Sequence, residues 1–413
     1  MNFLKNNKLE IKNYNIVTYG ILFIGDPHLW SKRPGRRRDD SFLDTLLAKL
    51  EFIVEKSNSL HLWPVITGDF FHEDDDSDPE MLIKIIKVMQ KLHRKPLTIV
   101  GNHEINEWVL TEDNALSLLS ITNQMDVIDK NGFWGKLELT NKEDGTTRLV
   151  GIGGTPYGQK IPYDLTEFVG LEGKSFREDL DIIAMEKSKL AIRSAATRGN
   201  APLLLESNTN EELKPNADTN KLIHDTIECD EIIWLTHHDL AFEGTYPNSL
   251  PLHNIDGVDM LVNGHIHGTK KPVLVGNTAC YNPGNITRLS IDMAEHKPSV
   301  WSYIPFNNNG MASSKGVRVP KIEQIIIPHK SGKEIFNFEG KHVKSSLLDE
   351  DFENIDINNS VFVELLKKEG ISGRTDDAIY VKESLEDLYG KYEVKNSVKT
   401  VVNSLLNRVL GEE

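Results

Sequence analysis

Residues 19–28 read YGILFIGDPH, and this stretch decides how the first part of the chain folds. The apolar run Tyr19–Ile24 has the length and continuity of a strand that is buried on both faces. It ends in Gly25 and Asp26, so a tight turn and a polar side chain follow the strand at once. Strands of this kind occur in parallel sheets that are covered by helices, and we therefore expect an α/β fold.

The same pattern of a strand followed by polar residues recurs twice in the next eighty residues. Strands are predicted at Pro64–Thr67 and Leu97–Val100, and apolar residues at helical spacing predict helices at Ser41–Val54 and Met81–Leu92. The order is βαβαβ. Ligands of open α/β sheets bind at the carboxyl ends of the strands, so the polar residues there mark a candidate site.

The rest of the chain is predicted to form two further parts. Later strands are expected at Arg148–Ile152, Glu231–Thr236, Asp259–Asn263, 271–275 and 298–304, with a helix at Phe176–Ala195 and an exposed loop at 197–220. Residues 306–317 are polar and predict a linker between a domain of residues 1–305 and a smaller C-terminal region, 318–413. That region begins with a predicted strand, Ile322–Ile327, and ends in an amphipathic helix, Val394–Leu410.

Charge and composition exclude several classes of protein. The 413 residues include 47 Lys and Arg and 62 Asp and Glu, and the net charge of −15 argues against a protein that coats DNA electrostatically. Two cysteines exclude a disulfide scaffold and a Cys-rich zinc site. No run approaches the roughly 18 apolar residues of a membrane span, and the first residues lack the apolar core of a secretory signal. We expect a cytoplasmic protein with no membrane partner.

Five short motifs that follow predicted strands supply oxygen and imidazole donors. They are Gly25-Asp26-Pro27-His28, Gly68-Asp69, Gly101-Asn102-His103-Glu104, Thr236-His237-His238 and Gly264-His265-Ile266-His267. Such donors suit Mn, Fe or Zn. Two metals about 3.5–4 Å apart can hold both oxygens of an in-line phosphoryl displacement. The inventory therefore predicts a dinuclear centre that hydrolyses phosphate esters.

The order and residue types of these motifs resemble those of the calcineurin-like metallophosphoesterases, whose pattern is D-x-H, GD, GNH[E/D], H and GHxH. The resemblance extends from Asp26 to His267. It implies a four-layer αββα sandwich, in which two mixed β-sheets are flanked by helices, with a smaller C-terminal α+β or helical domain. It also implies two divalent metal ions, for which we favour manganese over magnesium, iron or zinc.

The resemblance assigns roles by position. One metal would be held by Asp26, His28 and His267, and the other by Asn102, His237 and His265, with Asp69 bridging the two. His103 would contact the phosphate and protonate the leaving oxygen. At the fourth motif His238 is the alternative ligand, and we favour His237 because it comes first after the strand.

The second motif indicates which members of the superfamily the chain resembles. Residues 68–72 read GDFFH, whereas protein phosphatases of the superfamily carry GD-x-x-DRG. The GDFFH form is similar to that of the SbcD-type double-strand-break repair nucleases and their phage relatives, and Asn282–Asn285 is similar to a turn that they share. This implies a DNA exonuclease and endonuclease of DNA repair, recombination or replication in a bacterial or phage-infected cell. Its partners would be DNA, an SMC-like coiled-coil ATPase docked on residues 318–413, and a second copy of the chain. His72 would orient the substrate phosphate.

A basic cluster, Lys32–Arg38, follows the first motif directly and places five cationic residues in seven. Contacts to the DNA backbone are expected from Lys32, Arg33, Arg36, Arg37 and Arg38, and Trp30 is a candidate for stacking on a base. The alternative is a solvated loop with no DNA role.

Two other functions remain open at this point. One is a phosphatase or small-nucleotide phosphodiesterase of the same superfamily. The other is a DNA-end-binding or assembly protein whose metal site is structural.

Overall fold

The computed structural model describes residues 9, 11–12, 16–73, 78–105, 110–112, 114–169, 217–245, 249–306, 311–312 and 318–338. All of them belong to one unit, Met1–Ile183 with Glu211–Lys341. The second unit, 184–210 with 342–413, lies outside the described residues. The predicted helices Phe176–Ala195 and Val394–Leu410 also fall outside them.

A six-stranded sheet forms around the opening stretch of sequence. Its order is β15 (Ile322–Ile326), β12 (Ser299–Tyr303), β2 (Gly20–Ile24), β3 (Leu62–Ile66), β4 (Leu97–Ile99) and β5 (Asp126–Ile128). Strands β2 to β5 are parallel, and at the other edge β12 pairs antiparallel with both β2 and β15. The helices α1 (Phe42–Ser59) and α2 (Pro79–Met89) connect the first three parallel strands, so the predicted βαβαβ unit is confirmed.

A second, seven-stranded sheet completes the sandwich. Its order is β1 (Ile11–Lys12), β6 (Gly132–Thr140), β7 (Thr147–Thr155), β8 (Glu231–Thr236), β9 (Met260–Asn263), β11 (Thr278–Asn282) and β10 (Lys270–Val275). Strands β7, β8, β9 and β11 are parallel. Strand β6 pairs antiparallel with β7 and parallel with β1, and β10 pairs antiparallel with β11. Both sheets are therefore mixed.

Short elements join these strands. They are α3 (Ala115–Ile121), α5 (Ala217–Ile227), α6 (Gly332–Ile335), the 3-10 turns η1 (Asn102–Glu104), η2 (Glu167–Val169) and η3 (Ile291–Met293), and the paired strands β13 (Met311–Ala312) and β14 (Arg318–Val319). Among the described residues, no helix is long and apolar enough to cross a membrane.

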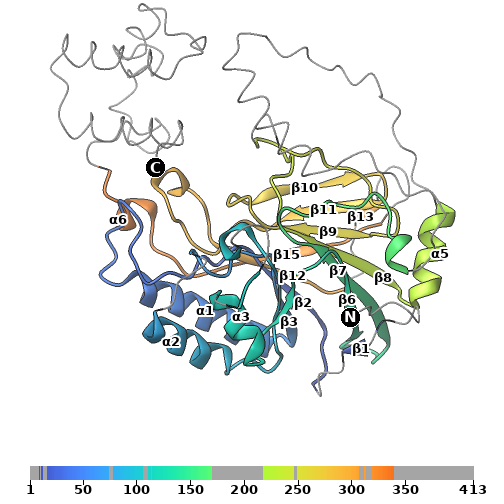
Figure 1. The fold of residues 1–413 in the computed structure, drawn as a ribbon, viewed down its shortest axis with the longest axis horizontal. Helices are drawn as coiled ribbons and strands as arrows, with labels where there is room; N and C mark the ends of the chain where they lie inside the picture. Colours follow the sequence, from blue (N-terminus) through green and yellow to red (C-terminus); the bar gives the residue numbers. More distant parts are fainter. Residues whose placement is uncertain are drawn as a thin grey trace, which may run out of the picture. The chain divides into compact units, whose positions relative to one another are not determined.

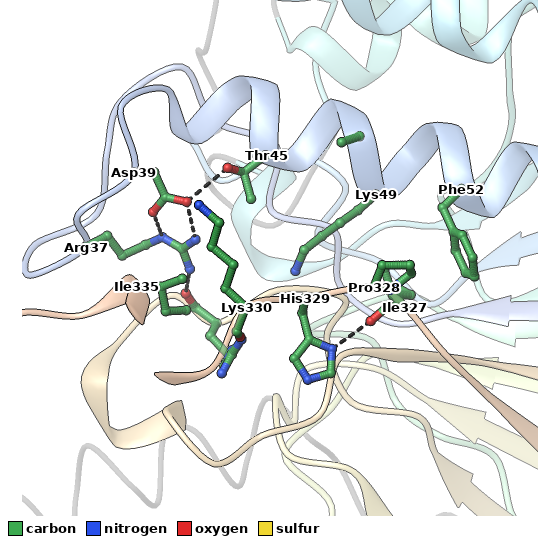
Figure 2. Close-up of a pocket in the computed structure, with 12 residues that line it drawn as sticks. Arg37, Asp39, Thr45, Lys49, Phe52, Ile327, Pro328, His329, Lys330 and Ile335 are labelled. Carbon is green, nitrogen blue, oxygen red and sulfur yellow. Dashed lines mark hydrogen bonds and ion pairs between the residues drawn. The ribbon is translucent and has the colours of Figure 1, made fainter. Parts of the chain in front are cut away.

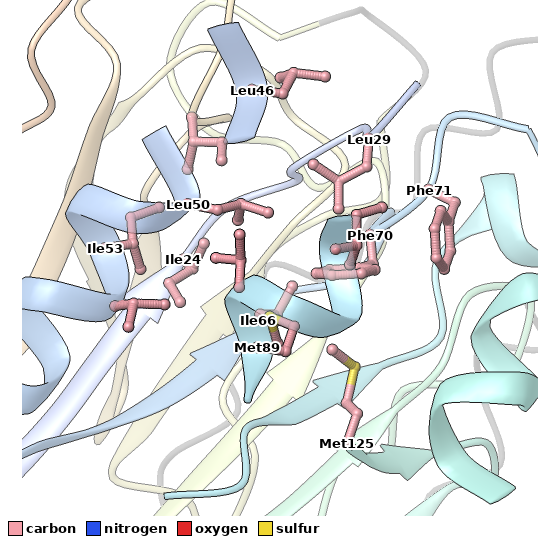
Figure 3. Close-up of a cluster of buried hydrophobic side chains, with 14 of the residues drawn as sticks. Ile24, Leu29, Leu46, Leu50, Ile53, Ile66, Phe70, Phe71, Met89 and Met125 are labelled. Atoms are coloured by element: carbon pink, nitrogen blue, oxygen red, sulfur yellow. The ribbon is translucent and has the colours of Figure 1, made fainter. Parts of the chain in front are cut away.

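Two hydrophobic cores explain why β2 is apolar at every position. Side chains of a strand alternate between its faces, so Leu22 and Ile24 pack toward α1 and α2 while Ile21 and Phe23 pack toward the second sheet. Figure 3 shows the first core, which contains Leu46 and Leu50 of α1 together with Ile24 of β2.

The second core lies between the two sheets. It joins Phe23 of β2 and Val65 of β3 to Ile152 of β7 and Leu235 of β8. The helix α5 lies against the outer side of the seven-stranded sheet (Figure 1), where its Ile223 and Ile227 are buried. The predicted four-layer αββα fold is confirmed.

Local sequence fixes where the connecting helices begin. The Ser41 hydroxyl accepts a hydrogen bond from the Asp44 amide at 3.1 Å, and Asp78 caps α2, whose first residue is Pro79. Such caps satisfy amides that have no partner within the helix. Both helices are thereby held in place over the first core.

The expected division of the chain at residues 306–317 is corrected by the structure. Strand β15, placed by the sequence in a separate C-terminal domain, pairs with β12 along its whole length, from Tyr303–Ile322 to Ser299–Ile326. The apolar pattern identified the strand but carried no information about its partner. Residues 217–220 also begin α5 instead of ending a loop.

Candidate metal centre

The five motifs come together because each follows a strand at the same edge of the sandwich. Asp26, Asp69 and Asn102 follow the parallel strands β2, β3 and β4 of one sheet. His237 and His265 follow the neighbouring parallel strands β8 and β9 of the other sheet. The edges of the two sheets meet at this point, and all seven predicted ligands lie within two adjoining clusters.

The first cluster contains Asp26, His28 and His267, whose ligand atoms all lie within 4.8 Å of one another. The two imidazole Nε2 atoms are 3.0 Å apart, and Asp69 Oδ2 is 3.6 Å from His28 Nε2. Two nitrogens about 2.1 Å from one metal at a right angle would have a similar separation.

The second cluster contains Asp69, His237 and His265. Asp69 Oδ2 is 3.1 Å from His237 Nε2, and Asn102 Oδ1 lies 3.2 Å from that nitrogen and 2.7 Å from His265 Nδ1. Asp69 therefore faces both clusters, as a bridging carboxylate must.

Three of these residues have backbone conformations that L-amino acids rarely adopt. The φ angles are +46° at His28, +46° at Asp69 and +70° at His265. Each such residue costs on the order of 1–3 kcal/mol and persists only where its surroundings enforce it. The strained positions coincide with the clustered imidazoles and carboxylates, as expected when side chains are aimed at a shared ligand.

Close packing around the carboxylate explains two of the motif glycines. A Cβ at Gly101 would lie 2.2 Å from Asp69 Oδ1, and a Cβ at Gly68 would lie 2.3 Å from His237 Nδ1. Real side chains do not tolerate such distances. Only glycine at these positions allows the second and third motifs to approach the same point.

Hydrogen bonds fix which nitrogen of each key imidazole faces the centre. His237 Nδ1 donates to the Thr67 carbonyl at 2.7 Å, which leaves Nε2 toward Asp69. His103 Nδ1 donates to the His72 carbonyl at 2.6 Å, and its amide donates to Asp69 Oδ1 at 3.0 Å. Such outer contacts orient metal-binding histidines and set their tautomers.

The charges of the centre favour a cation between the clusters. Burial by itself would lower the pKa of His237, but Asp69 and Asp26 raise it to about 10. Burial also raises the pKa of Asp26 to about 7. A positive charge at His237 Nε2, supplied by a proton or by a metal, thus relieves the buried carboxylates.

The remaining imidazoles are in the form that binds metals. Burial lowers the pKa of His265 to about 3 and that of His267 to about 4, and it also lowers the pKa of His28. A metal ligand must be neutral imidazole, so these three require no deprotonation at neutral pH.

The residues present fit two divalent cations. Asp26 Oδ2 is buried and accepts no hydrogen bond among the described residues, and the Nε2 atoms of His28 and His267, 3.0 Å apart, can both face one cation when each ring carries its proton on Nδ1. A cation satisfies all of these acceptors at once. The mixture of imidazole nitrogens and carboxylate and amide oxygens suits Mn, Fe or Zn.

His72 and Trp30 lie beside the first cluster. His72 Nδ1 is 3.4 Å from His28 Nδ1, and its ring stacks on His103 with centroids 5.1 Å apart. The centroid of the Trp30 ring lies 4.3 Å from that of the His72 ring. Burial, followed by the charge of His103, lowers the pKa of His72 to about 4. The predicted pair His72 and His103 is therefore placed together beside the ligands.

Glu104 has a structural role that the sequence did not suggest. Its carboxylate accepts hydrogen bonds from the amides of Gly101 at 2.7 Å, Asp69 and Phe71 at 3.2 Å each, and Phe70. It thereby fastens the second motif to the third. The signal was its place in the GNHE motif, but only the fold shows which amides it reaches.

Tyr157 was also not predicted. Its ring lies 5.6 Å from His265 and 6.3 Å from His237, and it follows β7 at the same edge of the sheet. His238, the alternative ligand, points elsewhere, since its Nε2 donates to the Gln159 carbonyl at 3.0 Å. The geometry thus places His237 in the cluster.

The basic cluster divides into exposed and buried members. Lys32, Arg33, Arg36 and Arg38 are exposed, although Lys32 pairs with Glu73 at 2.9 Å. Arg37 is buried, and its Nε and Nη2 donate to the Asp39 carboxylate at 2.7 and 2.8 Å. The expected DNA contact of Arg37 is therefore wrong, because the charge of Arg37 is neutralised inside the protein.

The sandwich and the two facing clusters define a metal-dependent phosphoesterase. The family model for calcineurin-like phosphoesterases matches residues 19–269, and the chain belongs to this family. Its members typically bind two divalent metals.

One solved structure that is similar is a 5′-nucleotidase precursor from Thermus thermophilus, at 12% sequence identity and a TM-score of 0.36. The match covers 76% of this chain and 55% of that protein, so the chain spans about half of its length. No curated protein is significantly similar in sequence.

Proposed function

We propose that the chain is a metal-dependent DNA exonuclease and endonuclease that hydrolyses phosphodiester bonds. The observation that carries this proposal is the group formed by His28, His72, His103 and Trp30. An aromatic ring that packs on a pair of stacked imidazoles beside a candidate metal site suits a substrate that has a base on one side of its phosphate.

The metals and the protein groups have separate tasks. Two divalent cations, when bound, polarise the phosphoryl oxygens and activate the attacking water. The seven proposed ligands would hold them, with manganese favoured, and Glu104 keeps the second and third motifs in register.

His103 is proposed as the general acid. Its Nδ1 is committed to the His72 carbonyl, so Nε2 is the atom that can hold a proton for the leaving oxygen. His72 is mostly neutral at pH 7 because its pKa is about 4, and it can orient a phosphate oxygen through an N–H group.

The exposed cations extend this site toward a polynucleotide. Lys32, Arg33, Arg36 and Arg38 follow Trp30 in the chain and lie at the protein surface. Phosphate contacts from such residues position a nucleic acid without reading its sequence. The net charge of −15 implies that the chain alone binds DNA weakly.

The proposed partners follow from that weakness. An SMC-like coiled-coil ATPase would supply DNA clamping, in repair, recombination or replication, and a second copy of the chain is a further candidate partner. Of residues 318–413, which are proposed for ATPase docking, those beyond 338 lie outside the described residues.

A second candidate function is supported by the net charge of −15 and by the burial of Arg37, which removes one expected DNA contact. Under this alternative the same centre acts on small phosphate esters, as a phosphatase or small-nucleotide phosphodiesterase.

A comparison of substrates distinguishes the two proposed functions. The purified chain with Mn²⁺ is given labelled single- and double-stranded DNA, bis-p-nitrophenyl phosphate as a small diester, and p-nitrophenyl phosphate as a monoester. The nuclease proposal expects DNA cleavage, and it expects that Trp30→Ala lowers DNA cleavage about tenfold while hydrolysis of the small diester is retained. Rapid turnover of the monoester without any cleavage of DNA would contradict it.

A further inference from the structure

A second cavity, separate from the metal centre, lies where α1 faces the segment between β15 and α6. It has a volume of about 370 Å³ and is lined by Arg37, Lys49, Phe52, Arg288 and Lys330, among others. None of the seven proposed metal ligands lines it. Figure 2 shows Lys49 reaching from α1 toward Pro328 and His329, with Lys330 beside Asp39.

The cavity wall contains more buried positive than negative charge. Arg37, Lys49 and Arg288 are 4%, 7% and 3% exposed, whereas Asp39 is the one carboxylate that lines the cavity. Asp39 is already occupied by the bidentate pair with Arg37 and by the Thr45 hydroxyl at 2.9 Å. Lys49 and Arg288 therefore have no carboxylate partner in this wall. The lining thus contains three buried cations and one carboxylate, and such an excess of buried positive charge is costly, so it points to an anionic ligand.

The cations are held in place by the backbone. Arg37 Nη1 donates to the Arg288 carbonyl at 2.5 Å, and the Arg288 guanidinium donates to the carbonyls of Ala294, at 2.8 Å, and Lys330. Arg288 Nε is buried and has no hydrogen-bond partner among the described residues. These side chains are fixed before any ligand arrives, which lowers the entropic cost of binding.

Lys49 has donors to spare. Its ammonium has three N–H groups, of which one donates to the Ile286 carbonyl at 2.7 Å. Burial, followed by the charges of Arg37 and Arg288, lowers the pKa of Lys49 to about 7. That shift reports the same excess of positive charge around the ammonium.

We propose that this cavity binds a small phosphate monoester, with the phosphate at Lys49 and Arg288. A phosphate dianion matches the two cations that lack a carboxylate, and tetrahedral oxygens can accept from both an ammonium and a guanidinium. The volume lies within the range of small-molecule sites and exceeds what a phosphate alone would fill. Phe52, Ile327 and Ile335 give the organic group apolar contacts. A mononucleotide has this chemistry.

This proposal does not depend on which phosphoester the metal centre hydrolyses. Its test is calorimetric titration of the Mn-loaded protein with dAMP, inorganic phosphate and 2′-deoxyadenosine, the last of which has no phosphate. Binding of dAMP and phosphate is expected, whereas the nucleoside should not bind. The metal centre can also bind phosphate, so the same titrations are made on Asp69→Asn, in which the cavity site should persist.

Two substitutions then assign the site. Both substitutions are made in the Asp69→Asn background. Lys49→Met should lower the affinity for dAMP at least tenfold. Lys330→Met, which changes an exposed side chain, should lower it about threefold. Lys87→Met, at an exposed position of α2 outside the cavity, is the matched control and should change nothing. The proposal is overturned if Asp69→Asn abolishes all dAMP binding, or if neither Lys49→Met nor Lys330→Met alters the site that remains.

Discussion

The metal centre and the cationic cavity show opposite imbalances of buried charge. At the metal centre, carboxylate and imidazole acceptors gather and Asp26 Oδ2 has no donor among the described residues. In the cavity, donors gather around Lys49 and Arg288, and Asp39 is the lining carboxylate. Buried polar groups in proteins are ordinarily paired, so each imbalance indicates the charge of the missing partner. The excess of acceptors at the metal centre indicates bound cations, and the excess of donors in the cavity indicates a bound anion.

The two regions also differ in how their residues are distributed along the chain. The metal ligands sit in short motifs that follow strands, so each motif is visible in the sequence. Lys49, Arg288 and Lys330 come from three separate places and form no motif. The metal centre can therefore be recognised from short stretches of sequence, whereas the cavity can be recognised only in the folded protein.

The largest effect is expected from the carboxylate that faces both metal clusters. Asp69→Asn keeps the size of the side chain but removes the charge that would bridge two cations. We expect activity to fall by more than the roughly 10–100-fold that follows loss of an outer-shell partner, together with loss of bound metal. Metal analysis and initial rates measure both. If Asp69→Asn kept two metals per chain and full activity, Asp69 would not be a bridging ligand. Lys49→Met is the control and should change neither the metal content nor the rate.

The pH dependence of metal affinity should be the next largest effect. Metal binding requires neutral His237 and ionised Asp26, whose pKa values without metal are about 10 and about 7. Affinity should therefore rise with pH, about tenfold per unit between pH 7 and 10 and more steeply below pH 7, because a second proton must then leave. Titrations of Mn²⁺ at pH 6, 7 and 8 measure these slopes. An affinity that is flat over this range would show that neither residue binds the metal.

Substitution of Arg37 tests whether the charges beside the cavity are buried, through the free energy of unfolding. Arg37→Ala leaves the Asp39 carboxylate without its bidentate partner, and breaking a buried pair in this way costs about 3–5 kcal/mol of unfolding free energy. Arg33→Ala, in the exposed part of the same cluster, should change stability by less than about 0.5 kcal/mol. Urea denaturation measures both. Equal effects of the two substitutions would mean that Arg37 is as solvated as its neighbours.

The smallest expected effect concerns the anion itself. Phosphate at about ten times its dissociation constant should stabilise the folded chain by about 1.4 kcal/mol, which is a rise in melting temperature of a few degrees. The comparison is made against chloride at equal ionic strength, so that screening is matched. The rise should be lost in Lys49→Met and kept in Asp69→Asn. A rise that follows Asp69 and not Lys49 would assign the phosphate to the metal centre.

How much the sequence could predict follows from the same contrast. The parallel βαβαβ unit could be predicted from the strand that ends at Ile24 and from the next two strands, because a continuous apolar run indicates a strand that is buried on both faces. The ligands from Asp26 to His267 were predictable since each lies within one or a few residues of a strand end. The fourth motif left His237 and His238 open, because adjacent side chains differ only in direction, which the fold decides.

The parts that could not be predicted depend on contacts between distant segments. Glu104 reaches amides more than thirty residues away in sequence, and β15 pairs with β12 across a stretch that resembled a linker. Arg37 looked like a DNA contact because charge alone was visible. Asp39, two residues later, was a signal of a buried ion pair, but its burial required the packing of Phe42 and Phe336 around the guanidinium.

The most direct test of the catalytic proposal is His103→Ala, assayed in Mn²⁺ for DNA cleavage and for bound metal together. His103 is not one of the seven proposed ligands, and its amide, which donates to Asp69 Oδ1, is kept in the variant, so the metals should stay. Loss of a general acid should lower cleavage by about 10²- to 10⁴-fold. Cleavage of DNA by the wild type, with this loss at unchanged metal content in the variant, is the predicted result. Unchanged behaviour of the variant would contradict it and would favour a DNA-binding protein whose metal site is structural.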